Sequence, residues 1–244
     1  MLGFIIRNLG VKGLLIKLEG FKKEREWLRV KVRRAMKFKL SKGSLGVLLS
    51  RLEGFQRPKV RLEQYPTEPE IAADMLWNAF LMGDIEGKVI VDLGCGTGVL
   101  GIGALILGAR RVSFVDFDSE ALEIAKRNLL KARSESSFRG VAEFMLSDVK
   151  DLELKGEVVV QNPPFGVKVR HSDRQFLGKA MEIAPIIHSL HKSESNRFLS
   201  SFCSDNRFDI TNQKQYDFPL KRTMQFHKKR IHRIKVSWYR LEKR

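Results

Sequence analysis

The pattern of hydrophobic and polar positions predicts two helices before the first strand. Apolar residues recur at helical spacing over 41–52, and Gly54 then ends that helix. A second helix is expected to begin at Thr67, an N-cap residue with Glu70 at the spacing of a capping box. Its buried stripe would consist of Ile71, Met75, Leu76 and Phe80. Both helices are therefore expected to pack on a common core.

Four short apolar runs then alternate with helical segments, which is the order that builds a parallel sheet. The expected strands lie at 89–91, 111–115, 141–146 and 158–160. The expected helices lie at 100–105, at 119–131 with Ser119 as N-cap, near 173–188 and near 193–203. Extended segments at 208–220 and 223–241 can close the sheet as antiparallel strands. The pattern thus indicates an α/β domain with a mostly parallel sheet.

A glycine-rich turn follows the first predicted strand, with the sequence Asp92-Leu93-Gly94-Cys95-Gly96-Thr97-Gly98. Its glycines allow a tight turn and a close approach of the backbone to a ligand. The next strand ends in Asp116, 24 residues after Asp92, where a carboxylate can accept hydrogen bonds from a ribose diol. Because the turn begins with Asp and lacks the dinucleotide spacing, the nucleoside half of S-adenosylmethionine fits better than NAD.

Polar residues end three successive predicted strands, namely Asp116, Asp148 and Asn162. A single acid in such a place is more often a helix cap, but three on one edge behind a glycine turn favour a ligand site. Asp148 is placed to accept from an adenine amino group, while the backbone N–H of Val149 donates to the ring. The sequence therefore predicts a nucleoside pocket at this edge.

The fourth strand leads into Asn162-Pro163-Pro164-Phe165. Both prolines lack a backbone N–H and have a fixed φ, so strand pairing stops there and the carbonyls stay free as acceptors. An amide beside a free carbonyl and an aromatic ring suits a planar group that bears an NH2. We therefore expect this loop to bind a base with an exocyclic amine.

The charge of this 244-residue chain is +17 and is concentrated at its ends. Residues 1–35 hold ten basic and three acidic residues, and residues 205–244 hold twelve and four. Such ends suit a polyanion such as RNA, although lysine-rich termini can also serve solubility alone. The candidate RNA contacts are Lys168, Arg170, Arg174, His227, Lys228, Lys229 and Arg230. A solvated hairpin tip is the alternative for the last four.

Cysteine and histidine usage excludes several classes of protein. Cys95 and Cys203 form neither a metal-spaced pair nor a disulfide framework, which favours a reducing, cytoplasmic location. The five histidines lack partners at metal-ligand spacing, so no metal site is expected. No apolar run is long enough to span a membrane.

The sequence predicts a basic N-terminal extension at 1–40, followed by one catalytic domain at 41–244. Three interpretations of the extension stay open: an RNA-binding segment, a membrane-surface helix, or translated sequence ahead of a later start at Met36.

Five segments stand in the order found in the methyltransferase-like protein 5 group, which the chain resembles over roughly 45–241. They are Leu62-Glu63-Gln64-Tyr65-Pro66-Thr67, Asp92 to Leu100, Asn162-Pro163-Pro164-Phe165-Gly166, Ser189-Leu190-His191-Lys192 and Phe226-His227-Lys228-Lys229. The group comprises S-adenosylmethionine-dependent adenine-N6 methyltransferases of small-subunit ribosomal RNA. The resemblance implies a Rossmann-like class I methyltransferase fold, in which a mostly parallel seven-stranded sheet has helices on both faces and an antiparallel C-terminal strand.

The resemblance also implies residue roles. Gln64 and Thr67 would line the cofactor pocket near its methionine end. The turn would bind the cofactor through Asp92, Gly94, Gly96, Thr97 and Val99. Asp116 would hold the ribose, and Asp148 with Val149 the adenine. Asn162, Pro163, Pro164 and Phe165 would bind the target base.

Two departures from the group's pattern are Val167 and Gln161, the second replacing an apolar strand residue. Eukaryotic members work with a small zinc-binding activator subunit, so such a partner is a further expectation. The rival functions are protein-glutamine methylation, DNA adenine methylation and RNA binding without catalysis.

Overall fold

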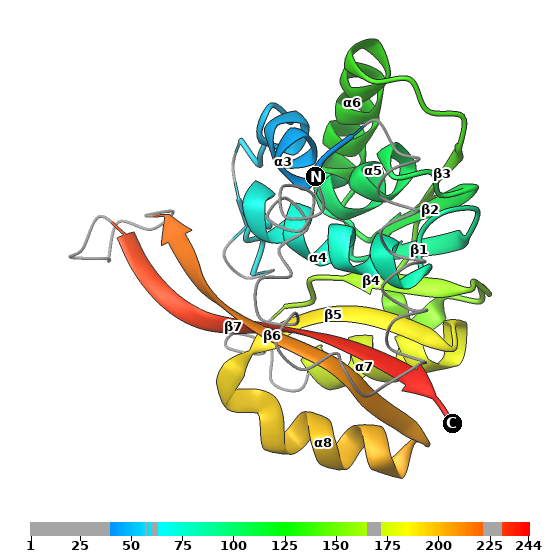
Figure 1. Ribbon diagram of the computed structural model, residues 1–244, viewed down its shortest axis with the longest axis vertical. Helices are drawn as coiled ribbons and strands as arrows, with labels where there is room; N and C mark the ends of the chain where they lie inside the picture. Colours follow the sequence, from blue (N-terminus) through cyan, green and yellow to red (C-terminus); the bar gives the residue numbers. More distant parts are fainter. Residues whose placement is uncertain (1–39, 57, 60–62, 165–171, 222–230) are drawn as a thin grey trace, which may run out of the picture.

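The computed structural model describes residues 40–56, 58–59, 63–164, 172–221 and 231–244. They form a seven-stranded sheet in the order β3-β2-β1-β4-β5-β7-β6, with helices on both faces (Figure 1). The strands are β1 (Val89–Leu93), β2 (Arg111–Asp116), β3 (Val141–Leu146), β4 (Val158–Gln161), β5 (Ile186–Lys192), β6 (Phe208–Lys221) and β7 (Ile231–Lys243). The expected Rossmann-like architecture, a mostly parallel seven-stranded sheet with helices on both faces, is confirmed.

Strands β1 to β5 run parallel, and β7 pairs antiparallel with both β5 and β6. The central strands β1 and β4 are covered on both faces, which explains their nearly continuous runs of Val and Ile. β7 enters between β5 and β6, so the last strand of the chain lies inside the sheet. The predicted antiparallel closure is confirmed.

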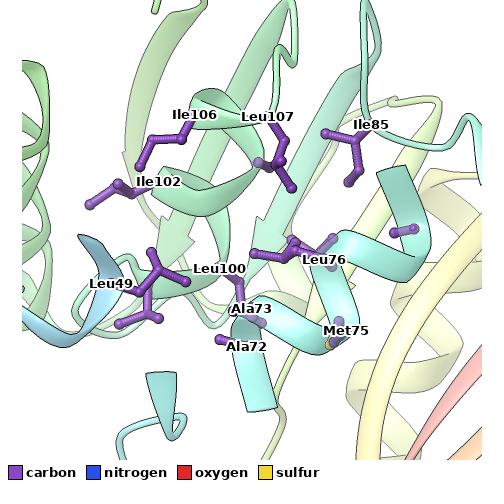
Figure 2. Packing of buried hydrophobic residues seen from close by; sticks show 14 of the residues in the cluster. Leu49, Ala72, Ala73, Met75, Leu76, Ile85, Leu100, Ile102, Ile106 and Leu107 are labelled. Carbon is purple, nitrogen blue, oxygen red and sulfur yellow. The ribbon is translucent and has the colours of Figure 1, made fainter. Parts of the chain in front are cut away.

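The helices divide between the two faces of the sheet. They are α3 (Lys42–Ser50), α4 (Pro69–Met82), α5 (Val99–Ile106), α6 (Ser119–Glu135), α7 (Ser172–Ile183) and α8 (Asn196–Asp205), with short 3₁₀ turns at η3 (Val149–Asp151) and η4 (Ser193–Ser195). Apolar side chains of α3 to α6 form one core cluster, and those of α7 and α8 form the other. Figure 2 shows side chains of this first cluster from three helices, among them Leu49 of α3, Leu76 of α4 and Ile102 of α5.

Two predicted helix caps are wrong. Helix α4 begins at Pro69 after Glu68, which makes no side-chain cap bond, so Thr67 lies one residue too early to cap it. Proline is favoured in the first turn because its missing N–H is not needed there, and this sets the start of the helix. Helix α6 is capped by Asp118, whose carboxylate accepts from the backbone N–H of Glu120, and not by Ser119. Asp and Ser cap about equally well, so sequence could not choose between neighbours.

The helix predicted over 173–188 is also wrong at its C-terminal end. Helix α7 ends at Ile183, and residues 186–192 form strand β5 between β4 and β7. Pro185 disfavours helical backbone at the residue before it and was the available signal. The polar residues of β5 concealed the strand, because His188, Ser189 and His191 are all buried. The helix predicted at 193–203 is a 3₁₀ turn followed by α8.

A buried ion-pair network joins the loop after α4 to strands β5 and β7. The Arg240 guanidinium donates to Asp84 through Nε at 2.7 Å and Nη2 at 3.2 Å. His188 Nε2 lies 3.0 Å from the same carboxylate, and Trp238 Nε1 donates to His188 Nδ1, so Nε2 carries the histidine proton. Burial alone would raise the pKa of Asp84, but bonds from His188 and Arg240 lower it to about 2. This network fixes the last strand to the body of the domain.

The proposed extension at 1–40 falls almost entirely outside the described residues, and so does the 222–230 hairpin segment. In the part of the chain that the structure describes, no helix is long and apolar enough to cross a membrane.

Candidate functional site

A pocket of about 260 Å³ lies at the carboxyl ends of β1, β2 and β4 and beside the residues that follow β3. The structure brings all ten sequence-predicted cofactor residues to its wall. They are Gln64, Thr67, Asp92, Gly94, Gly96, Thr97, Val99, Asp116, Asp148 and Val149. Asn162 and Pro164 of the predicted base-binding loop also line it, Pro163 does not, and Phe165 lies outside the described residues. The pocket therefore lies at the edge of the sheet that the sequence predicted.

The glycine turn needs its glycines for backbone shape and for space. Gly94 and Gly96 have φ of 69° and 53°, the left-handed region that side chains rarely adopt. A Cβ on Gly94 would lie 2.7 Å from the ring of Phe176, and one on Gly96 would lie 3.0 Å from the ring of Phe55. Two aromatic rings therefore rest on the backbone of the turn, and the absence of a Cβ at these two glycines gives the rings their space.

Asp116 is held rigidly at the end of β2. Its carboxylate accepts from the backbone N–H of Gly96 at 2.8 Å and from that of Asp118 at 3.0 Å. Burial raises the pKa of Asp116, although these backbone bonds oppose the shift. A carboxylate has about four acceptor positions, so these backbone bonds do not use them all and a diol can still be accepted. This geometry suits the ribose role that the strand-end position predicted.

Asp148 lies at the far side of the pocket, exposed, and caps η3 by accepting from the backbone N–H of Lys150. The next residue, Val149, is buried against the sheet. Phe117, which follows Asp116, also lines the pocket and keeps 53% of its surface exposed. An exposed ring in the wall of the pocket is a surface on which a purine can stack.

Gln64 lines the pocket through an unexpected set of partners. Its amide donates to Asp118 at 2.7 Å and accepts from the backbone N–H of Lys59, whose ammonium also binds Asp118. This places the Gln64 amide beside the residue that follows Phe117, next to the Asp116 side of the pocket. Thr67, by contrast, lies against Asn162.

Asn162 has one end of its amide occupied and the other free. Nδ2 donates to Thr67 Oγ1 at 3.0 Å, which joins the start of α4 to the end of β4. Oδ1 is shielded from water and, among the residues that the structure describes, has no hydrogen-bond donor. A buried acceptor without a donor costs free energy unless a ligand supplies one. The geometry therefore presents an acceptor suited to an N–H group of a bound molecule.

Asp92 lies beneath the turn and is fully enclosed. Its Oδ2 accepts from the backbone N–H of Gly101 in α5 at 2.8 Å. Burial raises the pKa of Asp92 from 3.8 to about 7, although the bond from Gly101 opposes the shift. The folded state therefore holds a proton here that the unfolded chain loses above pH 4. The resulting stability is fully present below pH 4 and is lost as the pH rises toward 7.

Asp92→Asn should therefore become more stable relative to the wild type as the pH rises from 5 to 8. The amide can still accept from Gly101, and it never ionises. Each pKa unit of separation is worth about 1.4 kcal/mol, so a difference of a few kcal/mol is expected above pH 7. Urea unfolding at pH 5, 6, 7 and 8 measures it, with the exposed Asp205→Asn as control. An equal difference at every pH would contradict the assignment.

The structure tests few of the predicted RNA contacts. Lys168, Arg170, His227, Lys228, Lys229 and Arg230 lie outside the described residues. Arg174 is exposed and stacks its guanidinium over the Phe202 ring at 5.4 Å. The basic C-terminal segment also serves internal ion pairs, because Lys214, Arg240 and Arg244 bind Asp74, Asp84 and Asp209. Part of the positive charge of the C-terminal segment is therefore neutralised within the protein, and less of it can contact RNA than the net charge suggests.

Several pocket residues carried no sequence signal. Phe55, Phe117 and Phe176 line the cavity, yet each is an isolated aromatic in the sequence. Asn128 of α6 was missed as well: its amide bonds the carbonyls of Thr97 and Glu53 and the backbone N–H of Glu53. This buried residue ties the glycine turn to the segment after α3. Such roles depend on tertiary contacts that spacing does not reveal.

Comparison with known proteins decides the family. The family model described as methyltransferase small domain matches residues 67–183. A zebrafish (Danio rerio) protein named rRNA N(6)-adenosine-methyltransferase METTL5 is 35% identical over 79% of this chain and 94% of its own length. The chain belongs to the METTL5 family of methyltransferases.

Archaeal relatives of this METTL5-family chain are at least as similar. A protein of Methanocaldococcus jannaschii, named only as uncharacterized, is 39% identical over 84% of this chain and 95% of its own. A solved structure from Pyrococcus horikoshii, titled as a candidate RNA methyltransferase, is 40% identical with a TM-score of 0.74 and covers 83% of this chain and 96% of its own. The predicted family and enzyme class are confirmed.

Proposed function

We propose that this enzyme transfers a methyl group from S-adenosylmethionine to N6 of an adenine in small-subunit ribosomal RNA. The family fixes methyl transfer, and the named relatives act on rRNA adenosine. What carries the proposal for this chain is the buried Oδ1 of Asn162, an acceptor at the pocket that lacks a donor among the described residues.

The residues present fit the cofactor. The glycine turn, with Gly94 and Gly96 in left-handed backbone, lines the pocket, and the backbone N–H of Gly96 holds Asp116 in place beside it. Asp116 keeps acceptor positions for ribose hydroxyls, and Asp148 with Val149 would contact the adenine. When bound, S-adenosylmethionine supplies an electrophilic methyl group on a sulfonium centre. Thr67 and Asn162 would lie at the methyl-bearing end, because they lie across the turn from Asp148.

The chemical problem is a weak nucleophile, since the N6 lone pair of adenine is delocalised into its ring. Asn162 Oδ1 and the Pro163 carbonyl would accept the two amine hydrogens and draw the nitrogen toward a tetrahedral shape. The nitrogen lone pair would then point at the methyl carbon. Catalysis would rest on positioning and directed acceptors, and the proton would leave to water after transfer.

The base must leave its stack to enter such a pocket, and Phe165 is proposed to stack on it. The phosphates on either side would be held by the basic residues already named, including Arg174. Residues 1–40 are proposed to lie outside the catalytic domain at 41–244. The cytoplasm is the proposed location, because Cys95 and Cys203 are both free and buried.

Transfer of labelled methyl from S-adenosylmethionine to small-subunit rRNA tests the proposal. Label recovered as N6-methyladenosine is the expected result. A DNA competitor of the same sequence should not reduce the transfer. Label recovered in ribosomal protein would instead identify the substrate as a glutamine side chain. Its amide NH2 is as weak a nucleophile as the adenine amine. Cofactor binding without transfer to any substrate would favour a non-catalytic RNA-binding protein or a missing partner.

We further propose that a small zinc-binding activator subunit pairs with the enzyme. In support, β3 is an edge strand of the sheet, and its Val141 and Leu146 are 49% and 62% exposed. Leu130 of the neighbouring α6 is exposed as well. Exposed apolar groups on an unpaired strand edge suit a partner that adds a strand. Full activity of the purified chain alone would contradict this requirement.

A further inference from the structure

We infer that Thr67 is a positioning residue that selects the catalytically useful orientation of the Asn162 amide. The inference rests on the proposed function, because the orientation matters only if Asn162 must accept from a substrate amine. It departs from the expectation that Thr67 serves the cofactor.

A side-chain amide has two chemically opposite ends. Its oxygen accepts and its nitrogen donates two hydrogens, while the two ends have nearly the same shape. Turned one way, Asn162 presents an acceptor to an incoming NH2 group. Turned the other way, Asn162 directs its own NH2 group at the substrate NH2 group. Both groups are donors, so the substrate amine has no acceptor. The active site therefore requires a device that fixes the rotation of this one group.

Thr67 is the residue in contact with the nitrogen end. Its Oγ1 accepts from Asn162 Nδ2 at 3.0 Å, and the side chain is largely buried. A hydroxyl can donate as well as accept, so the contact alone would allow both rotations. The opposite rotation would, however, leave Nδ2 shielded from water without an acceptor. Orphaned buried N–H groups are rarer than under-satisfied carbonyls, which favours the rotation that leaves Oδ1 free.

The position of the Thr67 hydroxyl is itself fixed. Thr67 does not cap α4, because the helix starts at Pro69, so its hydroxyl is available for Asn162. Pro66 and Pro69 on either side have fixed φ, and the β-branched side chain restricts χ1. Asn162 stands on the opposite side, directly after buried β4. Two stiff segments 95 residues apart thus meet at this one hydrogen bond.

Two variants separate this role from a merely structural one. Thr67→Val keeps the branched shape and removes the hydroxyl, whereas Thr67→Ser keeps the hydroxyl. Single-turnover methyl transfer at saturating S-adenosylmethionine should fall roughly 10²-fold in Thr67→Val, the loss that a small misplacement of a reacting group causes. Thr67→Ser should stay within a few-fold of the wild type. Cofactor affinity, measured by calorimetry, should be unchanged in both.

A second readout does not depend on methyl transfer. The side-chain ¹⁵N–¹H signals of Asn162 are assigned by their loss in Asn162→Ala. The bonded proton should shift upfield in Thr67→Val and stay in place in Thr67→Ser.

Three outcomes would overturn the inference: wild-type transfer by Thr67→Val, an equal loss in Thr67→Ser, or a loss in Thr67→Val that tracks weaker cofactor binding. If the wild-type enzyme methylates no RNA but the Asn162 amide signals still depend on the Thr67 hydroxyl, the proposed substrate is wrong. The proposed orientation of the Asn162 amide is then still supported.

Discussion

Asn162→Ala should slow methyl transfer by roughly 10² to 10³ while the protein still binds S-adenosylmethionine. The substitution removes Oδ1, the buried acceptor that lacks a donor among the described residues, and leaves the glycine turn and Asp116 in place. Removing one directed hydrogen-bonding group at a reacting centre costs roughly 10² to 10³ in rate. The measurement pairs a single-turnover assay with cofactor titration on the same preparation.

A matched control for this experiment is Asn206→Ala. Asn206 is exposed beyond the end of α8, where its amide donates to the Phe202 carbonyl. It should retain both methyl transfer and cofactor binding. Asn162→Ala could instead bind the cofactor more weakly and recover methyl transfer at high cofactor concentration. That result would assign Asn162 to the cofactor and contradict its role at the target base.

Arg240→Ala should cost the domain about 3–5 kcal/mol of unfolding free energy, because it leaves a buried charge without its partner. Among the residues that the structure describes, only His188 would still bond the Asp84 carboxylate. Burial lowers the pKa of His188, so the histidine is not a substitute cation near neutral pH. Urea unfolding at pH 7 measures the loss.

Arg244→Ala is the control, since it also removes an arginine paired with an aspartate. Arg244 and Asp209 are both about half exposed, and such surface pairs contribute at most about 1 kcal/mol. Similar losses in the two variants would show that Arg240 acts as one more surface charge. A much larger loss in Arg240→Ala would confirm that burial, and not the salt bridge alone, sets the cost.

The pocket could be predicted because its residues follow from local rules. Strand-end acids behind a glycine turn must meet at one edge of a parallel sheet, and Asp116, Asp148 and Asn162 do. The prolines after Asn162 end strand pairing by their own chemistry. These predictions of the pocket depended only on the order of strands and helices along the chain. Errors in where individual helices begin or end therefore did not change them.

The errors arose where tertiary contacts outweigh local preference. Strand β5 carries His188, Ser189 and His191, which are polar in sequence but buried between neighbouring strands. Gln161, a departure from the family's apolar pattern, is buried too and donates to Ser189. Their partners come from other strands, so the one local signal was Pro185, which ends the helix but does not show that a strand follows.

The insertion of β7 between β5 and β6 means that the domain cannot be completed in the order of its synthesis. Until residues 231–243 emerge, β5 has an open edge, and β6 has no neighbour in the sheet. The contact of Arg240 with Asp84 spans 156 residues, so the chain closes a very long loop at its last step. A premature stop a dozen residues from the end would therefore remove an interior strand and not a tail. The resulting chain would expose an aggregation-prone edge beside a buried carboxylate that has lost its arginine partner.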